Sequence, residues 1–513
     1  MSTQLLEATT LWSLLEARAA LTPEAPMLID GQRGLRMTFR QAREIAERLA
    51  AGLLGRGIGP GSTVTWQLPT GLTAVMTALA LARLGAVQNP VISLYGEREV
   101  AALLARNGSD FYLIPGAGER DFPTMAESLC AGLERPPQRI VMAGDLPQGA
   151  PSSLPQAPVD GDAVRWVYYT SGTTSEPKGA RHTDRTLLLG GLNLARAMRV
   201  TSADIGTVAF PYAHIGGAMY TAMLLASGMS AVLLERFQVE QAVEIFRRHG
   251  VTTTGGSTAH YEALLAEQRR QPERPLLPGL RLLCGGGAAK PAELYYHVKQ
   301  WIGCALTHNY GMTEVPLICA GSPGHPDEAL ASSEGLPVVG IELRIVRLDG
   351  QLAALGETGE VRVRGEGVFK GYTDTQLDSE AFDADGFFRT GDLGMLRADG
   401  RVTLTGRLKD VIIRKGENIS AKEIEDLLYT HPKVAAVAVI GLPDSERGER
   451  VCAVVEAKEG LAPLQFAEMV AYFEQARVMR QKIPEQLEVV ERLPRSESLN
   501  KVLKNVLRER FDR

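Results

Sequence analysis

A run of hydroxyl and glycine residues has the composition of a polyphosphate-binding loop. It is followed closely by one lysine and comprises Thr170, Ser171, Gly172, Thr173, Thr174 and Ser175, with Lys178 beyond it. Small residues let backbone N–H groups face a cavity, hydroxyls add donors, and a lysine adds a compact positive charge. A Walker A loop needs Gly-Lys before Ser or Thr, whereas Pro177 precedes Lys178, so a P-loop NTPase is excluded. The run predicts another kind of phosphate loop, with a Ser/Thr-rich surface loop as the alternative.

A second short segment combines an aromatic ring, a hydroxyl and a carboxylate. It reads Asn309, Tyr310, Gly311, Met312, Thr313 and Glu314. The Tyr310 ring can stack on adenine, and Thr313 can donate to a phosphate oxygen. Glu314 can bind Mg²⁺, a hard cation that takes oxygen ligands. The alternative is a β-turn with an N-capping threonine.

Asp392 follows a glycine, so its carboxylate is expected at the tip of a loop. A carboxylate that accepts two ribose hydroxyls is a common way to bind a sugar. Arg407 can add a donor to the same ribose. Taken alone, an aspartate at this position is more often a helix cap or a turn residue.

Two isolated residues have the chemistry of a site but lack local support. His214 lies in an uncharged stretch after Pro211, where a packed core histidine is the alternative. Lys501 is one of many basic residues near the carboxyl end, where solubility is the simpler explanation. The charged segment 406–425 has the composition of a solvated face, and it also lies where the sequence pattern changes.

Strand-like and helix-like patterns alternate from about residue 60 to residue 300, which predicts parallel sheets covered by helices. A helix is expected at 71–84, and strands are expected at 63–68, 163–168, 205–210, 230–234, 251–254 and 280–283. Ligands of such sheets bind at the carboxyl ends of the strands. The most flexible loop is expected at 147–158, because this segment is rich in proline.

The pattern changes near residue 340. Segments 343–348, 360–364 and 401–405 alternate apolar and polar residues next to Asp-Gly turns, which predicts antiparallel strands. In the last hundred or so residues, helices are expected at 421–428 and 465–475, and strands at 434–440 and 451–455. This length suffices for a small α+β domain with its own core.

Composition excludes several classes of protein. The chain has 513 residues, 45% of them hydrophobic and 22% charged, and its net charge is −5, which disfavours binding to a nucleic-acid backbone or an anionic membrane. The five cysteines contain no CxxC pair, so neither a disulfide framework nor structural zinc is expected. The uncharged stretch 215–234 favours a buried helix, a turn at Gly228 and a strand over a membrane span. With no signal peptide expected, a soluble cytoplasmic protein is predicted.

Several segments, taken in order, resemble the adenylate-forming superfamily, which includes acyl-CoA synthetases, luciferases and peptide-synthetase adenylation domains. The resemblance covers most of the chain and rests on segments 169–179, 211–217, 285–288, 309–314, 390–392, 406–425 and 494–501. It implies a large N-terminal α/β domain, residues 1–408, of parallel-rich sheets covered by helices plus a small antiparallel β region. A small mobile α+β domain, residues 409–513, would follow it.

The resemblance also implies a role for each matching residue. Lys501 would be the catalytic lysine, together with Thr313 and the metal ligand Glu314, and Lys409 would be the hinge. The remaining nucleotide and CoA positions would be the phosphate loop, Gly286, Gly287, Ala288, His308, Asn309, Tyr310, Asp392, Arg407, Lys415 and Gly416. The acid would contact His214, Gly217, Ser257, Gly311 and Met312.

The implied reaction is ATP-dependent ligation of a carboxylic acid to coenzyme A. Acyl-AMP and pyrophosphate form first, with Mg²⁺, and acyl-CoA and AMP form second. A weak similarity at 89–99 favours an aliphatic or alicyclic acid and a role in fatty-acid and lipid metabolism, and a homodimer is possible. The alternatives are carrier-protein loading, a luciferase-like oxygenase and a nucleotide-binding protein without catalysis.

Three positions depart from the family pattern. Ser175 and Asn500 stand where glycines are usual, and both residues are expected to preserve the local backbone. Segment 255–258 lacks a proline often found there, so the acid is the least transferable part of the resemblance.

Overall fold

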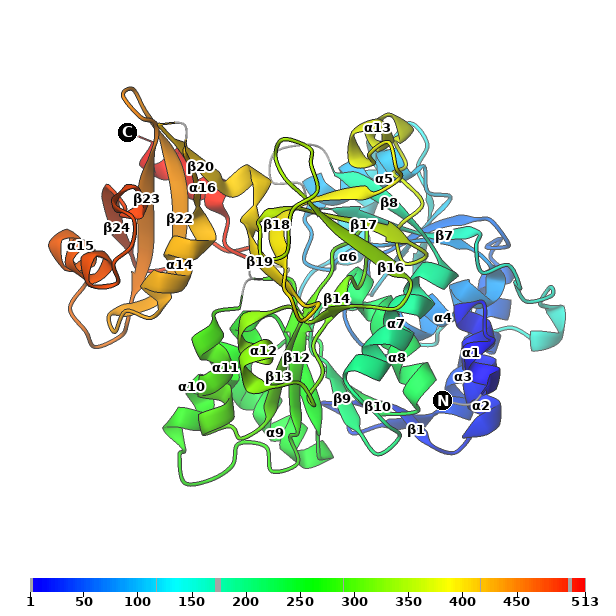
Figure 1. Cartoon of the computed structure of the whole chain (residues 1–513). Coiled ribbons are helices and arrows are strands. Elements are labelled where there is room, and N and C mark those ends of the chain that lie inside the picture. The colour runs from blue at the N-terminus through cyan, green and yellow to red at the C-terminus, as the bar shows by residue number, and fades with distance from the viewer. Residues whose placement is uncertain are drawn as a thin grey trace.

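The computed structural model describes residues 3–116, 118–170, 177–288, 290–415, 417–496 and 501–512. It is a mixed α/β structure in which the described strands form five sheets. Two sheets are mainly parallel, and a third has equal numbers of parallel and antiparallel pairs. One further sheet is antiparallel, and one belongs to a small C-terminal domain, as expected. Figure 1 shows this domain, coloured orange to red, beside the rest of the molecule.

A six-stranded sheet carries the segment that leads into the hydroxyl-rich run. Its strands, in spatial order, are β6 (Gln138–Val141), β5 (Phe111–Ile114), β3 (Thr63–Trp66), β4 (Val87–Pro90), β7 (Val164–Thr170) and β8 (Lys178–Thr183). All neighbours are parallel except β7 and β8, whose register pairs Thr170 with Lys178. The two ends of the run are therefore fixed opposite each other.

Two further sheets complete the parallel part. The first contains β2 (Arg36–Thr38), β1 (Pro26–Asp30), β10 (Ser230–Leu233) and β9 (Ile205–Val208). The second contains β11 (Thr253–Gly256), β12 (Leu282–Gly286), β13 (Ala305–Tyr310), β14 (Cys319–Ala320) and β15 (Leu336–Pro337). In the second sheet β11, β12 and β13 are parallel, so their carboxyl ends meet at one edge.

Helices cover these sheets, and an apolar core lies between them. The helices are α1 (Thr3–Leu6), α2 (Leu11–Leu21), α3 (Phe39–Leu54), α4 (Leu72–Leu84), α5 (Glu97–Asn107), α6 (Phe122–Ala131), α7 (Asp184–Ala197), α8 (Ile215–Ser227), α9 (Val239–His249), α10 (Thr258–Arg270), α11 (Ala292–Trp301) and α12 (Asp327–Ser332). The core contains the buried rings of Trp12, Trp66 and Trp166. Helix α8 packs along α7 and α2, which confirms that the uncharged stretch is a buried helix, with Gly228 as a left-handed cap. None of the described helices is long and apolar enough to cross a membrane.

The antiparallel sheet and the C-terminal domain follow in sequence. The sheet contains β16 (Ile341–Val346), β17 (Gly359–Gly365), β18 (Phe388–Leu396) and β19 (Val402–Arg407), with α13 (Asp378–Ala381) beside it. The C-terminal domain contains β20 (Val411–Arg414), β21 (Glu417–Ser420), α14 (Ala421–Tyr429), β22 (Val434–Asp444), β23 (Gly448–Ala457), α15 (Phe466–Gln475), β24 (Gln486–Val490) and α16 (Lys504–Phe511). Its two apolar clusters contain residues of this domain alone.

The segment expected to be the most flexible loop lies against a helix. Segment 147–158 packs against α3: Gly149 donates a backbone hydrogen bond of 3.0 Å to the Arg48 carbonyl. A Cβ on Gly149 would lie 2.7 Å from the Ala51 carbonyl carbon, which leaves no room for a side chain. Proline and glycine indicated the absence of a long helix or strand here, and the segment contains only a short 3-10 helix at Pro151–Ser153.

A buried guanidinium ties the N-terminal segment to the end of α8. Arg18 donates from Nε to the Leu225 carbonyl at 2.6 Å and from Nη2 to the Ala226 carbonyl at 2.7 Å. Its charge lies at the carboxyl end of α8, where the helix dipole favours a cation, and burial lowers the pKa of Arg18. The contact holds α8, whose other end carries His214.

We predict that Arg18→Met lowers the free energy of unfolding by about 2–3 kcal/mol, because two charge-assisted hydrogen bonds to buried carbonyls are lost. Urea unfolding followed by tryptophan fluorescence measures the change. The matched control is Arg40→Met, which removes an exposed ion pair with Glu24 and should cost less than about 1 kcal/mol. Equal shifts in the two variants would contradict the capping role of Arg18.

Candidate functional site

The candidate residues gather where the carboxyl ends of β12 and β13 approach β18 and β19. Gly286 ends β12 and Gly287 follows it, and a Cβ on Gly286 would collide with the Asn309 carbonyl oxygen of β13. Gly287 adopts a φ of +82°, which favours glycine. The chain can make this close turn at Ala288 because the glycines carry no side chain.

Asp392 is the most highly connected acid of the group. It lies on β18 opposite Arg407 of β19, and Arg407 Nε is 3.1 Å from Asp392 Oδ1. Tyr310 donates its hydroxyl to Asp392 Oδ2 at 2.8 Å. Burial raises the pKa of Asp392, and the nearby Arg407 charge opposes that shift. Each carboxylate oxygen has two lone pairs, so the fixed carboxylate can still accept hydrogen bonds from a ligand.

Lys501 lies at the base of a hairpin and belongs to the same group. Ser496 donates its backbone N–H to the Lys501 carbonyl at 2.7 Å, and Arg495 pairs with Val502. The Lys501 Cε would lie 4.0 Å from a Cβ placed on Gly287. The pKa of Lys501 is lowered to about 8, mainly by burial. The Arg407 and Lys409 charges act in the same direction, and the Asp392 charge opposes them. Residues from β12, β18, β19 and the C-terminal hairpin therefore share one electrostatic environment.

Glu314 lies in a second polar cluster with Lys178. Tyr372 donates its hydroxyl to Glu314 Oε1 at 2.7 Å, and the Lys178 Nζ is 5.5 Å from the centre of the Tyr372 ring. Burial raises the pKa of Glu314, and the Tyr372 hydrogen bond and the Lys178 charge oppose that shift. Thr170 and Lys178 fix the ends of the hydroxyl-rich run, while Ser171, Gly172, Thr173, Thr174 and Ser175 lie outside the described residues.

A tight turn joins these two clusters. Met312 donates its N–H to the Val315 carbonyl at 2.9 Å, and a Cβ on Gly311 would collide with the Pro316 carbonyl oxygen. His182 of β8 donates from Nε2 to the Thr313 carbonyl at 2.8 Å. Burial lowers the pKa of His182 to about 4, so this imidazole is neutral at pH 7. The half-buried Thr313 is thereby held next to Glu314.

The end of β13 presents polar atoms that lack partners in the described structure. His308 Nε2 lies 2.8 Å from the Ala288 carbonyl, but His308 Nδ1 and Asn309 Oδ1 are buried without a hydrogen bond. Burial, and to a lesser extent the Lys290 charge, lowers the pKa of His308 to about 3. Buried polar atoms nearly always find a partner, so this edge can accept a hydrogen-bonding ligand.

The remaining candidate residues lie in the first turns of α8 and α10. His214 caps α8, and its Nδ1 accepts the Gly216 N–H at 3.1 Å, so the neutral ring carries its hydrogen on Nε2. Burial, then the Lys501 charge, lowers the pKa of His214 to about 4. A Cβ on Gly217 would collide with the Tyr212 carbonyl oxygen, which makes this turn compact. Ser257 caps α10 and donates its N–H to His260 Nδ1 at 3.2 Å.

Not every expected residue joins the group. Lys415, at a left-handed φ of +50°, donates its N–H to the Arg447 carbonyl within the C-terminal domain, and Gly416 lies outside the described residues. Lys409 follows β19 and acts electrostatically on Lys501. Among the described residues no cluster of three or more His, Cys, Asp or Glu side chains could hold a metal ion.

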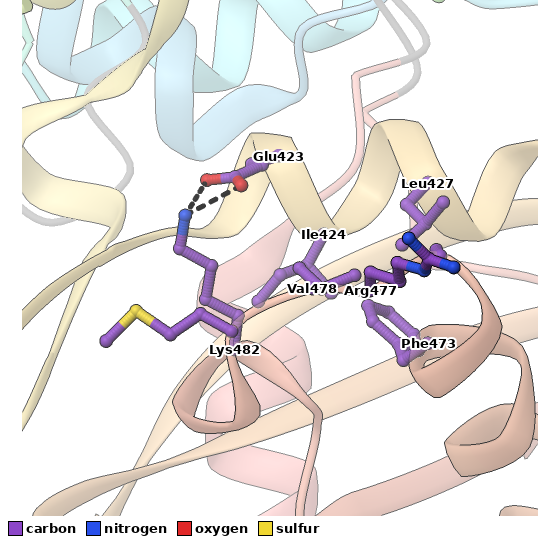
Figure 2. Close-up of a pocket in the computed structure, with 9 residues that line it drawn as sticks. Glu423, Ile424, Leu427, Phe473, Arg477, Val478 and Lys482 are labelled. Atoms are coloured by element: carbon purple, nitrogen blue, oxygen red, sulfur yellow. Dashed lines mark hydrogen bonds and ion pairs between the residues drawn. The ribbon is translucent and has the colours of Figure 1, made fainter.

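Three residues next to these clusters were missed from the sequence: His182, His260 and Tyr372. None lies in a motif whose composition indicates chemistry. Each forms a hydrogen bond with, or packs beside, a segment that is far away in the sequence. A hollow of about 410 Å³ on the C-terminal domain, between α14 and α15, lies outside both clusters. Figure 2 shows that it is crossed by the Lys482–Glu423 ion pair and walled by apolar side chains.

Comparison with known proteins gives the family. Residues 15–373 match the family described as AMP-binding enzyme, and residues 423–499 match the AMP-binding enzyme C-terminal domain. The chain is 32% identical to a sulfoacetate–CoA ligase of Cupriavidus necator, over 95% of this chain and 96% of the relative. It is 33% identical to a salicyl-AMP ligase / salicyl-S-ArCP synthetase of Mycobacterium tuberculosis, over 89% and 82%.

A solved structure agrees with these relatives. The crystal structure of ATP-bound MatB from Rhodopseudomonas palustris superimposes with a TM-score of 0.89 at 26% identity, covering 98% of this chain and 99% of that one. The chain therefore belongs to the adenylate-forming AMP-binding enzymes, and it is an AMP-forming acid–thiol ligase that uses ATP to convert a carboxylic acid into acyl-AMP and then into acyl-CoA.

Proposed function

We propose that this ligase activates a monocarboxylic acid with an uncharged aliphatic or alicyclic tail, and that Lys501 stabilises the transition state of acyl-AMP formation. The observation that carries the proposal is the position of Lys501. Its side chain approaches Gly287 of the nucleotide edge, and the Asp392 charge acts on it. An ammonium there neutralises charge that develops between the attacking carboxylate and the α-phosphate.

The uncharged tail is inferred from the first turns of α8 and α10, which we take as the wall of the acid pocket. Burial, then the Lys501 charge, lowers the pKa of His214, and burial lowers the pKa of His260, which the hydrogen bond to the Ala209 carbonyl opposes. The Phe237 and His260 ring centres lie 4.4 Å apart, and those of Phe210 and Tyr220 lie 6.2 Å apart. In this proposal Lys501 is engaged at the reacting carboxylate, so a second carboxylate or a sulfonate would need another cation, whereas an apolar tail would pack on these rings.

We assign the nucleotide to the side of Lys501 that lies away from the wall formed by α8 and α10. Asp392 would accept ribose hydroxyls, with Arg407 as an additional donor, and the Tyr310 ring would pack on adenine. Gly286, Gly287, Ala288, His308 and Asn309 would line the base, and the unpartnered Asn309 Oδ1 suits its exocyclic amine. Thr170, the hydroxyl-rich run and Lys178 would hold the phosphates.

Glu314 fits a magnesium ion held mainly by phosphate oxygens and water. A single buried carboxylate, oriented by Tyr372, provides a hard oxygen ligand. When bound, Mg²⁺ would offset negative charge on the phosphates, and Lys178 and Thr313 would bind oxygens nearby. The protein's own contribution is to orient this carboxylate and keep it from solvent.

The second half-reaction requires another arrangement of the same chain. We take the boundary at residues 408 and 409, so that the C-terminal domain, residues 409–513, turns about Lys409. Lys501 would leave the acyl carbon, and the Lys415-Gly416 turn would border the pantetheine thiol. A cytoplasmic role in fatty-acid or lipid metabolism agrees with the use of ATP and CoA and forms part of this proposal; a homodimer stays a prediction.

Loading of a carrier protein is the second candidate. The observation in its favour is the 33% identity to a relative named as a salicyl-S-ArCP synthetase. Both candidates share acyl-AMP formation, so they differ only in the thiol acceptor. A tethered pantetheine and free CoA present the same thiol and must be compared directly.

The substrate proposal predicts which acids cause ATP-dependent release of pyrophosphate. Aliphatic and alicyclic monocarboxylic acids should give kcat/KM values at least about tenfold above those of dicarboxylic, sulfonated and amino acids, because a buried unpaired charge costs more than about 1.4 kcal/mol. Thioester formation with free CoA and with a pantetheinylated carrier is measured in parallel. A preference for a doubly charged acid would refute the uncharged tail.

Lys501→Ala should slow acyl-AMP formation about 10²–10³-fold, the usual effect of removing one transition-state donor. Conversion of supplied acyl-AMP and CoA into thioester should change little. Rapid-quench measurement of the two half-reactions separates these effects. Equal loss in both would remove Lys501 from the proposed role.

The pKa of Lys501 gives a further prediction about pH. Because the ammonium form is the active one and its pKa lies at about 8, kcat/KM for ATP in adenylation should fall as pH rises through this value. The decline should approach tenfold per pH unit above it, since kcat/KM reports groups of the free enzyme. Lys501→Arg keeps its charge throughout this range and should lack this limb; an unchanged profile in that variant would contradict the assignment.

A further inference from the structure

One side-chain hydrogen bond joins the C-terminal domain to the first half of α10. Tyr429, the last residue of α14, donates its hydroxyl to Glu262 Oε1 at 2.8 Å. Glu262 lies five residues after Ser257 and two after His260, both of which belong to the acid-binding wall proposed above. The two partners are separated by 167 residues and lie on opposite sides of Lys409.

Glu262 also faces the hairpin that carries Lys501. Burial raises the pKa of Glu262, and both the Tyr429 hydrogen bond and the Arg495 charge oppose that shift. Arg495 pairs with Val502 and adjoins Ser496, which binds the Lys501 backbone. One carboxylate of the large domain thus faces α14 and the base of the Lys501 hairpin.

We propose that Glu262 and Tyr429 are positioning residues that hold the C-terminal domain in the orientation used for adenylation. The bond can exist only while α14 lies against α10, so it stabilises one orientation and contributes nothing to an orientation in which they separate. This inference rests on the proposed function of Lys501. Through Glu262, the large domain would help to determine which half-reaction the C-terminal domain is oriented for.

The expected effect is moderate because other groups share the same contact surface. Lys422 and Asp426 of α14 interact electrostatically with Lys290 of the large domain, and Lys422 also acts on Glu334. Loss of one hydrogen bond should therefore shift the balance between orientations by about three- to tenfold. A shift of this size changes a half-reaction without unfolding the protein.

The test compares Tyr429→Phe and Glu262→Ala with the matched control Tyr472→Phe. Tyr472 shares a 2.6 Å hydrogen bond with Thr430 inside the C-terminal domain, so the control also removes one tyrosine hydroxyl. In full-length enzyme, both test variants should slow acyl-AMP formation about three- to tenfold and leave the conversion of supplied acyl-AMP with CoA unchanged or faster. The double variant should resemble Tyr429→Phe, and Glu262→Gln, which keeps an acceptor oxygen, should be closer to the original enzyme.

A second readout follows the orientation without catalysis. Labelling of Lys501 by an amine-reactive reagent, quantified by mass spectrometry, should accelerate in Tyr429→Phe and not in Tyr472→Phe. Equal slowing of both half-reactions, or identical behaviour of Tyr429→Phe and Tyr472→Phe, would overturn the positioning role. Faster labelling with unchanged adenylation would instead overturn the role proposed for Lys501.

Discussion

The proposed nucleotide site depends on the interactions that stabilise the buried carboxylate of Asp392. A carboxylate this deeply buried stays ionised only if nearby groups stabilise it. Three elements supply them: Tyr310 from β13, Arg407 from β19 and the charge of Lys501 from the C-terminal hairpin. The requirement to compensate one charge therefore brings together parts of the chain that are nearly 200 residues apart.

The same electrostatics explain why a separate small domain is useful. In the proposed mechanism, a lysine that neutralises charge during adenylation would obstruct a thiol approaching the same carbon and would have to move away. Attachment of Lys501 to a domain with its own apolar clusters would allow this movement without disturbing the large core. The Glu262–Tyr429 bond would then be one of the contacts made and broken in each cycle.

Local elements followed from the sequence because their causes are local. The helix expected at 71–84 is α4, and the uncharged stretch with Gly228 predicted α8 and β10. Asp392 and Arg407 were expected to bind the same ribose. The register of β18 and β19 also makes the two residues direct neighbours, which was not expected. The family resemblance supplied the roles of Lys501 and Lys409, which composition alone would have assigned to solubility.

Long-range partners could not be predicted in the same way. Tyr372 orients Glu314, and His182 binds the Thr313 carbonyl, yet nothing near either residue indicates its partner. The contacts of segment 147–158 with α3 were not expected, because they depend on shape and not on pattern. Such contacts arise from how sheets and helices meet, which a single sequence does not specify.

The most direct test of the account is a crystal structure of the full chain with a non-hydrolysable ATP analogue and Mg²⁺. The account predicts that Lys501 Nζ and the hydroxyl-rich run bind the same triphosphate while Asp392 binds the ribose. A nucleotide bound with its ribose away from Asp392, or with Lys501 and the run facing different cavities, would contradict it.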